Sequence, residues 1–417
     1  MARVLRRADM TNVKTALVIG SGVAGPVAAM ALQRAGIEAT VYEAHDGPAD
    51  GVGAMLGLAP NGLNALSVIG ADETVRSIGE PVSSMITQSW TGKRLAEFGD
   101  AAGPPILHVM WRADLYRALY DEAVRRGVRI EHGRRLTGAT DTGESVTAVF
   151  ADGTRASGDI LIGADGIRSA IRSLIDPAAP QPRYTGLLGF GGWVTDTGLA
   201  GTGGAMHMIY GKRAFFSYKS YEDGRAGWFA NLPRQHPMSA AEAQTVGAQG
   251  WLRVLREAFA GDRTPARAIL ERCDPADLLI TGALEGMPPV PTWSRGRMVL
   301  IGDAAHATTP SSGQGASQAI ESAVQLARCL RDLPVSEAFA AYERLRRPRV
   351  ERIIATAART NSDKAAGPIA RVLRDLLMPV TMRLLARPEK MAWQFGYRID
   401  WDALAAAPGR TEPQPVR

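Results

Sequence analysis

Three glycine-anchored segments, far apart in the chain, carry residue types that suit the binding of a dinucleotide. They are Gly20-Ser21-Gly22-Val23-Ala24-Gly25, Gly163-Ala164-Asp165-Gly166 and Gly302-Asp303-Ala304-Ala305-His306. Each segment alone is a weak signal, because glycine-rich turns join many strands and helices. In this fixed order they predict one dinucleotide held from three directions, and they favour an FAD-dependent oxidoreductase.

The first segment has the surroundings that such a site requires. Residues 15–19 form an apolar run typical of a strand, and residues 24–35 carry small apolar side chains at helical spacing. The glycines permit a tight turn and let the backbone approach a pyrophosphate, while the helix N-terminus offers free amide donors. A second predicted strand, residues 38–42, ends in Glu43, whose carboxylate suits ribose hydroxyls.

Segments 159–172 and 297–323 resemble the two other signatures of single-component flavoprotein monooxygenases of the para-hydroxybenzoate hydroxylase type. The resemblance spans most of the chain and includes Pro60-Asn61-Gly62, Trp111-Arg112-Ala113-Asp114-Leu115 and Gly313-Gln314-Gly315. Residues 397–401 are also similar to the branch that contains tetracycline-modifying and small aromatic hydroxylases. This resemblance implies an α/β fold in which a Rossmann-type FAD-binding domain is interleaved with a β-sheet substrate domain and closed by C-terminal helices.

Several charged residues in these segments are expected at the cofactor. Asp303 follows a predicted strand, residues 297–301, so its carboxylate is placed to accept a ribitol or ribose hydroxyl; a helix cap is the alternative. Arg168 is placed to face a phosphate or the nicotinamide cofactor. Arg112 resembles the family arginine that lies along the FAD, with a surface arginine as the alternative. The predicted cofactor-binding residues are Gly20, Gly22, Ala24, Gly25, Glu43, Gly53, Arg112, Asp165, Arg168, Asp303, Pro310, Gly313, Gly315 and Ala316.

The turn at residues 310–315 bears most directly on the chemistry. It opens a predicted helix, residues 316–330, whose amide end would point at the pyrimidine side of the isoalloxazine and stabilise the negative charge of reduced flavin. The sequence departs from the family pattern at Ser317, often Asn, and at Ser322, often an acid, although Glu321 lies beside it. The predicted catalytic residues are Pro310, Gly313, Gln314 and Gly315.

The resemblance also implies the reaction. NADPH or NADH reduces FAD, O2 adds to the reduced flavin, and the resulting flavin hydroperoxide inserts one oxygen atom into an aromatic or polycyclic, polyketide-like molecule. The protein supplies orientation, electrostatics and a dry site. Because the sequence has no second glycine-rich βαβ unit, the nicotinamide cofactor is expected to bind transiently. Neither a metal nor an amino-acid nucleophile is expected.

A different pattern between about residues 181 and 273 predicts the substrate domain. Short apolar runs separated by glycine-rich turns indicate strands, and a predicted hairpin at 83–98 would join them in a sheet over the flavin. The predicted lining residues are Met206, Tyr210, Phe216, Tyr218, Trp228 and Asn231. Alternation along a strand leaves open that half of them face the opposite side. His207 is a candidate base, with a structural histidine as the alternative, and His306 is expected to pack without titrating.

The order of these motifs divides the chain into interleaved parts. We expect FAD-binding parts at 13–82, 99–180 and 283–339, a substrate hairpin at 83–98, and the substrate sheet at 181–282. Helices at 340–406 would close the molecule, and 407–417 would form a tail.

Composition is ordinary for a globular enzyme. The 417 residues are 46% hydrophobic and 22% charged, and no uncharged apolar run is long enough to predict a membrane span. Cys273 and Cys329 offer no disulfide framework, so a reducing cytoplasm is expected. Residues 1–12 are interpreted as a disordered leader, and the molecule is expected to be a monomer or a homodimer.

Two stretches suggest other partners. The net charge is +6, and a basic cluster includes Arg344, Arg346, Arg347, Arg349 and Arg352. Because Glu343 and Glu351 lie among these arginines, a solvated helix is favoured over a nucleic-acid surface. Residues 373–385 are apolar enough to suggest a membrane anchor, but the charged residues inside this stretch favour an amphipathic packing helix.

Three other functions share some of these features. A flavin-dependent halogenase needs a catalytic lysine and a Trp-x-Trp signature, and this chain lacks that signature. A reductase of isoprenoid double bonds would share the fold without consuming oxygen. A flavin-bearing protein that only sequesters its ligand is the non-enzymatic alternative.

Overall fold

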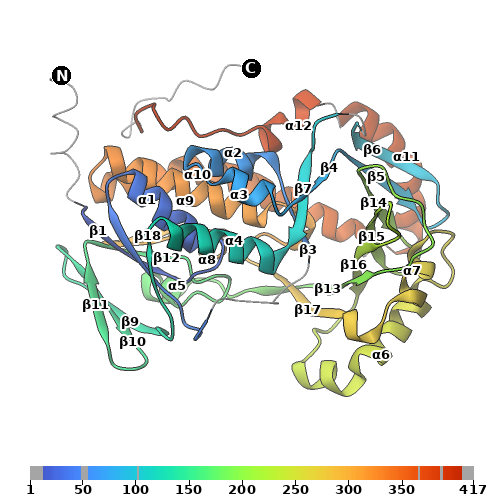
Figure 1. Cartoon of the computed structure of the whole chain (residues 1–417), viewed down its shortest axis with the longest axis horizontal. Helices are drawn as coiled ribbons and strands as arrows, with labels where there is room; N and C mark the ends of the chain where they lie inside the picture. Colours follow the sequence, from blue (N-terminus) through green and yellow to red (C-terminus); the bar gives the residue numbers. More distant parts are fainter. Residues whose placement is uncertain (1–12, 48–54, 101–102, 365–366, 386–387, 406–417) are drawn as a thin grey trace.

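A six-stranded sheet and a seven-stranded sheet lie toward opposite ends of the molecule, with helices between them (Figure 1). The computed structural model describes residues 13–47, 55–100, 103–364, 367–385 and 388–405. The first sheet is parallel except for one edge strand, and the second is mainly antiparallel. The predicted α/β fold with a Rossmann-type domain and a substrate sheet is therefore confirmed.

The six-stranded sheet brings the three glycine segments together. Its strands, in spatial order, are β18 (Ser294–Arg295), β19 (Met298–Leu300), β12 (Ile160–Gly163), β1 (Thr15–Ile19), β2 (Glu38–Tyr42) and β8 (Arg129–Glu131). Ile19 pairs with Gly163, and Gly163 pairs with Leu300. Because these strands are parallel and in register, the segments that follow β1, β12 and β19 meet at one edge of the sheet.

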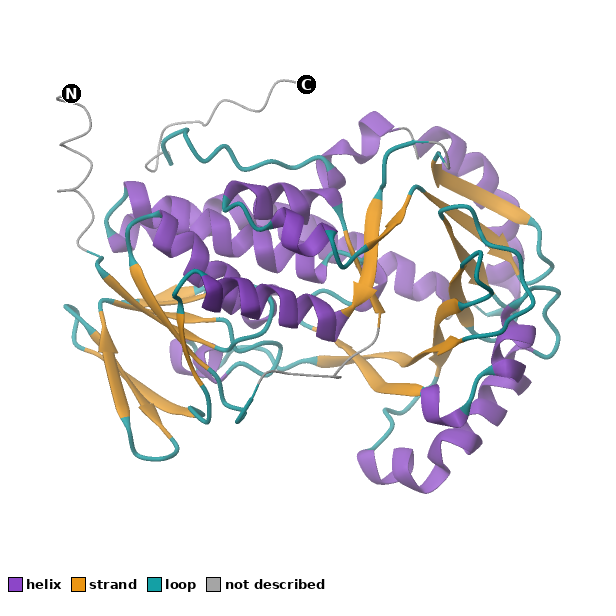
Figure 2. Cartoon of the chain, in the orientation of Figure 1, coloured by secondary structure: helices purple, strands orange, loops and turns teal. Residues whose placement is uncertain are grey.

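Helices pack beside this sheet (Figure 2). They are α1 (Ala24–Arg34), α2 (Pro60–Val68), α3 (Asp72–Arg76), α4 (Arg112–Arg125), α5 (Ala170–Ile175), α8 (Asp303–His306) and α9 (Gly315–Asp332). Helix α9 packs against α1, α2 and α10 (Val335–Lys364). Residues 317–330 of α9 are all buried, polar side chains included, so those side chains need partners inside the protein.

Two small sheets were not anticipated from the sequence. One consists of β9 (Leu136–Asp141), β10 (Val146–Phe150) and β11 (Arg155–Gly158), and the other of β3 (Met55–Leu58), β4 (Glu80–Val82) and β7 (Leu107–Trp111). Their strands have only three to six residues, and β4, β9 and β11 are mostly half-exposed or exposed, so the apolar pattern of these strands is weak.

The seven-stranded sheet includes the predicted hairpin. Its strands are β17 (Leu279–Gly286), β13 (Arg183–Val194), β16 (Ala226–Pro233), β15 (Phe215–Ser220), β14 (Ala205–Tyr210), β5 (Ser84–Ser89) and β6 (Arg94–Gly99). The same stretch of sequence also forms α6 (Ala240–Phe259) and α7 (Ala266–Arg272), which the sequence analysis did not predict. Both helices turn large apolar residues toward one face of this sheet, for example Phe259 of α6 and Ile269 of α7.

The basic cluster on α10 is not the solvated face that the sequence suggested. Arg344 and Arg352 are exposed, but Arg346 is fully buried and the side chain of Arg349 is only 9% exposed. The two buried guanidinium groups are paired with Glu321 of α9. These two arginines can be buried because Glu321, which lies on a different helix, neutralises their charge.

Helices α11 (Pro368–Leu385) and α12 (Pro388–Phe395) follow α10. In α11 the charged side is inward, because the Arg374 guanidinium lies 4.4 Å from the centroid of the Tyr210 ring. Its exposed large apolar residues are Ile369, Val372, Leu373, Leu376, Leu377 and Val380. This orientation is opposite to that of an ordinary amphipathic packing helix. Among the described helices, none has the length and hydrophobicity needed to cross a membrane.

Candidate active site

The turn after β1 has the backbone geometry that close ligand approach requires. Gly20 has a φ of +103°, and an added Cβ there would lie 2.6 Å from the Ala164 carbonyl oxygen. A Cβ at Gly25 would lie 1.9 Å from the Gly20 carbonyl oxygen. At Gly22, by contrast, a Cβ would meet no atom within 4 Å. Gly20 and Gly25 are thus required because a side chain at either position would collide with the backbone. Gly22 instead adjoins open space beside the N-terminus of α1, where a phosphate fits.

Glu43 stands at the end of β2, next to this turn. Its carboxylate accepts hydrogen bonds from the Ser21 backbone N–H at 2.7 Å and from the Ser21 hydroxyl at 2.8 Å. Burial by itself would raise the pKa of Glu43, but these bonds and the N–H of His45 outweigh it and lower that pKa. Glu43 is therefore held as an ionised acceptor, as a ribose-binding acid requires.

Asp303 and Arg112 come together from different elements. Asp303 is the first residue of α8, directly after the β19 segment, and Arg112 is the first residue of α4. Burial raises the pKa of Asp303, and the nearby Arg112 guanidinium opposes that rise. Arg112 also donates a hydrogen bond from Nε to the Tyr116 hydroxyl, a residue that sequence reasoning missed. A carboxylate acceptor and a guanidinium donor thus face the same edge of the sheet.

Asp165 and Arg168 are close to the site but have structural partners of their own. Asp165 Oδ2 accepts the backbone N–H groups of Ala170 and Ile171 at 2.8 and 3.1 Å, which caps α5. Its Oδ1 is buried without a hydrogen-bond partner among the described residues. Arg168, whose side chain is 72% exposed, pairs with Glu285 of β17 at 2.9 Å. This ion pair joins the loop after β12 to the seven-stranded sheet.

The turn before α9 leaves the first amides of that helix without a side-chain cap from its N-cap residue, Gln314. Pro310 begins a single 3-10 turn, η2 (Pro310–Ser312), and Gly313 follows in the left-handed conformation with φ +58°. Gly315 and Ala316 then open α9. Free amide donors at a helix N-terminus attract negative charge, so this end of α9 suits a reduced flavin ring.

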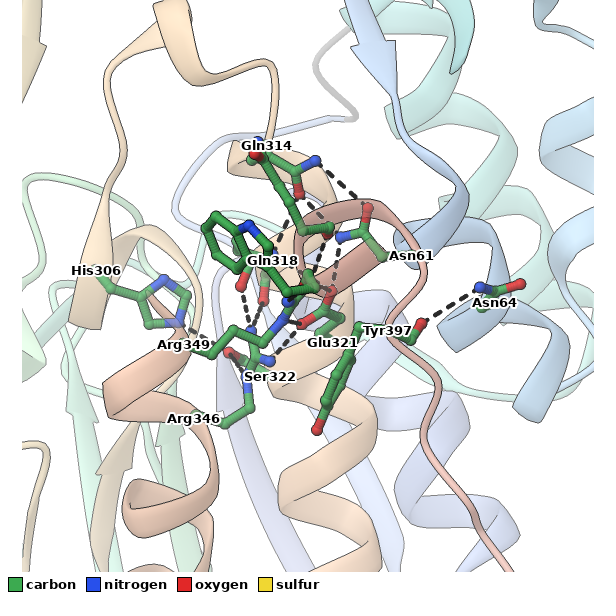
Figure 3. Close-up of polar contacts among 12 residues, drawn as sticks. Asn61, Asn64, His306, Gln314, Gln318, Glu321, Ser322, Arg346, Arg349 and Tyr397 are labelled. Carbon is green, nitrogen blue, oxygen red and sulfur yellow. Dashed lines mark hydrogen bonds and ion pairs between the residues drawn. The ribbon is translucent and has the colours of Figure 1, made fainter. Parts of the chain in front are cut away.

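The Gln314 side chain turns away from this turn into a buried polar network (Figure 3). Asn61 donates from Nδ2 to Gln314 Oε1 at 2.9 Å and to Glu321 Oε1 at 2.6 Å. Gln318 donates to the same two oxygens at 3.2 and 3.3 Å. We therefore infer that the Gln314 side chain holds the turn in position and does not contact the flavin.

Two arginines of α10 complete the network from the other side of α9 (Figure 3). Arg346 and Arg349 both bond to Glu321, the second at 2.9 Å. Burial alone would raise the pKa of Glu321, but the two guanidinium groups outweigh it and lower that pKa. His306 Nε2 lies 2.8 Å from Ser322 Oγ, and burial together with Arg346 lowers the pKa of His306 to about 3. This histidine is therefore neutral, as expected from its packed position.

Three of the predicted pocket residues lie on the wrong side of the seven-stranded sheet. Phe216, Tyr218 and Trp228 pack in the apolar cluster formed with α6 and α7. Phe216 contacts Phe259 of α6 with ring centroids 5.3 Å apart. These three side chains therefore face α6 and α7 and not the FAD-binding elements. Side chains of a strand alternate between faces, and the sequence does not show which parity faces the cofactor. His207 stacks on Tyr218 at 4.9 Å on this same side, which argues against a role as base.

The other three predicted residues share the opposite face, which we call the inner face. It carries Met206, Tyr210 and Asn231, together with Phe215 and Phe229 of the same strand parity. Met206 packs against Val82 and Val109 of the small sheet formed by β3, β4 and β7. The inner face therefore looks toward the strands that lead into α2 and α4.

Several residues with a place in the site were missed or cannot be located. Gly53 lies outside the described residues. Asn61 was quoted in a motif without a role, although a buried asparagine beside glycine was a usable signal. Arg346 was assigned to solvent, and Lys364 was not considered. Both are buried by residues from distant parts of the chain, so local sequence carries no sign of their position.

A comparison with protein-family models matches this chain to the FAD binding domain family over residues 13–212 and 289–357. The chain belongs to this family. It is 31% identical over 350 residues to an FAD-dependent urate hydroxylase of Klebsiella pneumoniae, covering 81% of this chain and 87% of the relative. It is also 31% identical over 437 residues to a salicylate hydroxylase of Pseudomonas putida, covering 93% and 94%.

A solved structure supports the same assignment. Klebsiella pneumoniae HpxO complexed with FAD and uric acid has a TM-score of 0.79 and 27% sequence identity, covering 91% of this chain and 97% of that one. The chain is thus an FAD-dependent monooxygenase of the hydroxylase type. NAD(P)H is the electron donor typical of this family. The open space at Gly22, the free amides of α9 and the Asp303–Arg112 pair all fit this cofactor.

The Asp303 carboxylate is expected to contribute strongly to FAD affinity in this monooxygenase. Asp303→Ala should weaken FAD binding by about 10- to 100-fold, the range of a hydrogen bond to a charged group. Fluorescence of FAD released on dilution measures the dissociation constant. Asp121→Ala, which breaks an exposed pair with Arg117 on α4, is the control and should leave FAD affinity unchanged. Equal affinities for both variants would remove Asp303 from the cofactor site.

Proposed function

We propose that this monooxygenase inserts one oxygen atom from O2 into an aromatic or polycyclic small molecule, with NADPH or NADH binding transiently as electron donor. The observation that carries this proposal is the inner face, where the side chains of Met206, Phe215 and Phe229 are apolar and mostly buried and that of Asn231 is polar. An apolar face with few polar groups, turned toward the cofactor-binding elements, suits a flat ring compound and excludes water.

The residues of the chain have separable tasks in this proposal. FAD, when bound, supplies the redox and oxygen chemistry. The amide end of α9, after Pro310, Gly313 and Gly315, stabilises negative charge on the reduced ring. Glu43, Asp303 and their neighbours orient the cofactor. No side chain is assigned as a general base, because the candidate His207 stacks on Tyr218 on the opposite side of the sheet from the inner face.

The relatives add support for a planar ring substrate. Their names specify urate and salicylate, and both compounds are flat, conjugated and electron-rich. An electron-rich ring is the substrate that an electrophilic oxygen donor requires. At about 31% identity we extend only this shared chemistry, and not either compound, to the present chain.

Oxidation of NADPH or NADH by the FAD-loaded protein in air is the direct test. A panel of phenols, aromatic acids and polycyclic compounds should contain members that accelerate oxidation and gain one oxygen atom, detected by mass spectrometry. With isotopically labelled O2, that atom should carry the label. Product that gains hydrogen without O2 uptake would favour a reductase, and tight ligand binding without oxidation would favour a sequestering protein.

A further inference from the structure

Lys364, the last residue of α10, places a cation on the inner face of the substrate sheet. Its side chain is nearly inaccessible, with 8% of the residue exposed. Its Nζ lies 2.7 Å from Asn231 Oδ1 and 4.0 Å from the centroid of the Phe215 ring. Asn231 itself is oriented by a bond from its Nδ2 to the Ala230 carbonyl oxygen, which leaves Oδ1 to accept from the lysine.

The charge of Lys364 has no acidic partner. Among the described residues, no Asp or Glu forms an ion pair with it, whereas the buried Arg346 and Arg349 share Glu321. Burial lowers the pKa of Lys364 to about 7, and no carboxylate counteracts that effect. A buried ammonium held by one amide oxygen and two aromatic rings is costly for stability, and such groups are typical of functional sites.

Two glycines of β13 lie opposite Asn231 and Phe229 on the inner face. Asn231 pairs with Gly189 across the sheet, and Phe229 pairs with Gly191. Neither glycine contributes a side chain to the face. At Gly189 an added Cβ would lie 2.2 Å from Thr281 Oγ1 and 2.7 Å from Leu284 Cδ2, so side chains of β17 occupy that part of the face. The Phe215 and Phe229 rings border Lys364 itself.

This part of the sheet also lies between two contacts with the FAD-binding domain. At the end of β17, a Cβ added at Gly286 would lie 2.8 Å from Thr309 Cγ2, in the turn that precedes α9. On β16, a Cβ at Gly227 would lie 3.0 Å from Met55 Sδ of β3. Asn231 stands four residues beyond Gly227 on the same strand. The lysine thus belongs to the face that the cofactor-binding elements close.

We infer that Lys364, held by Asn231, binds an acidic group of the substrate, so that the preferred substrates are aromatic or polycyclic compounds with a carboxylate or an acidic hydroxyl. This inference rests on the proposed monooxygenase function and narrows its substrate class. The acidic group would supply the partner that the ammonium lacks in the protein. A charge-assisted bond in a desolvated site also fixes the orientation of the ring.

Matched acids and amides test this inference with the FAD-loaded enzyme. The probes are benzoate, para-hydroxybenzoate and naphthoate, each beside its neutral carboxamide, and the change in flavin absorbance on titration reports Kd. We expect at least one acid to bind the wild-type enzyme about 10- to 100-fold more tightly than its amide, the range of a hydrogen bond to a charged group. Lys364→Met should abolish this preference by weakening acid binding, and Lys364→Arg should restore part of it.

Lys212→Met is the matched control. Its ammonium lies over the Trp90 ring at 5.5 Å, away from Asn231, so the same loss of charge should leave the acid preference intact. Thermal unfolding gives a second readout. Because Lys364 has no acidic partner, Lys364→Met should leave Tm unchanged or raise it. A lower Tm with acid and amide binding lost together would identify a structural lysine and overturn the inference.

The inference and the proposed function fail in different ways. Amides that bind as tightly as their acids, or an enzyme that binds none of the acids, would overturn the role of Lys364. Oxygen insertion into neutral phenols by the same preparation would leave the monooxygenase proposal intact. Acid-selective binding without any oxygen insertion would retain the lysine site and remove the proposed reaction.

Discussion

Glu321→Gln is expected to lower the free energy of unfolding by about 3–5 kcal/mol, the cost of removing one partner from a buried ion pair. The variant keeps the shape of the side chain but leaves Arg346 and Arg349 without their shared carboxylate. Asn61 also bonds to this carboxylate, so the loss extends to α2. Urea unfolding followed by tryptophan fluorescence measures the change.

The matched control for this prediction lies on α10, the helix that carries Arg346 and Arg349. Glu343→Gln breaks the Arg347–Glu343 pair, which is 2.7 Å long and partly exposed, and should cost less than about 1 kcal/mol. Equal costs for the two variants would contradict the role of the buried network in joining α9 to α10. Because α9 also presents its amide end to the cofactor, FAD should dissociate faster from Glu321→Gln only.

The pH dependence follows from the lowered pKa of Glu321. For an acid whose folded pKa is depressed, the stabilisation is fully present above the ordinary glutamate pKa of 4.5. It is lost as the pH falls through the lower pKa of the folded protein. The stability difference between wild type and Glu321→Gln should therefore be constant near neutral pH and shrink in acid.

Gly25→Ala and Gly22→Ala are expected to have opposite effects on folding and on FAD binding. At Gly25 the new Cβ would overlap the Gly20 carbonyl oxygen, so the backbone must shift at a cost of about 3 kcal/mol. At Gly22 the new Cβ meets no protein atom, so the FAD-free protein should unfold within about 0.5 kcal/mol of wild type.

FAD affinity separates these two glycines further. Gly22→Ala should weaken FAD binding by about tenfold, equivalent to 1.4 kcal/mol, because the methyl group occupies the space that the pyrophosphate needs. Unfolding of the FAD-free proteins and FAD titration measure the two effects independently. A Gly22→Ala protein that binds FAD as tightly as wild type would show that the phosphate does not approach this residue.

Local sequence was sufficient for the cofactor edge of the fold. The strands before Gly20, Gly163 and Gly302 are nearly continuous apolar runs, and this pattern is strong because both faces of a parallel sheet are buried. The close approach of Gly25 to Gly20 and the hydrogen bonds from Ser21 to Glu43 join residues that are near one another in the sequence. These features depend on neighbours in sequence, so the sequence alone determined the Rossmann-type half and its place for FAD.

Tertiary structure alone decided which side chains face the substrate and which charges are buried. Phe216 and Asn231 lie on adjacent strands of one sheet, yet their strand parity sends one toward α6 and the other toward Lys364. Arg346 and Arg344 are two residues apart on one helix, and only the first meets Glu321. These partners are 25 residues apart for Arg346 and Glu321 and 133 apart for Lys364 and Asn231. Such contacts arise from packing between elements, so the residues around each side chain do not reveal its partner.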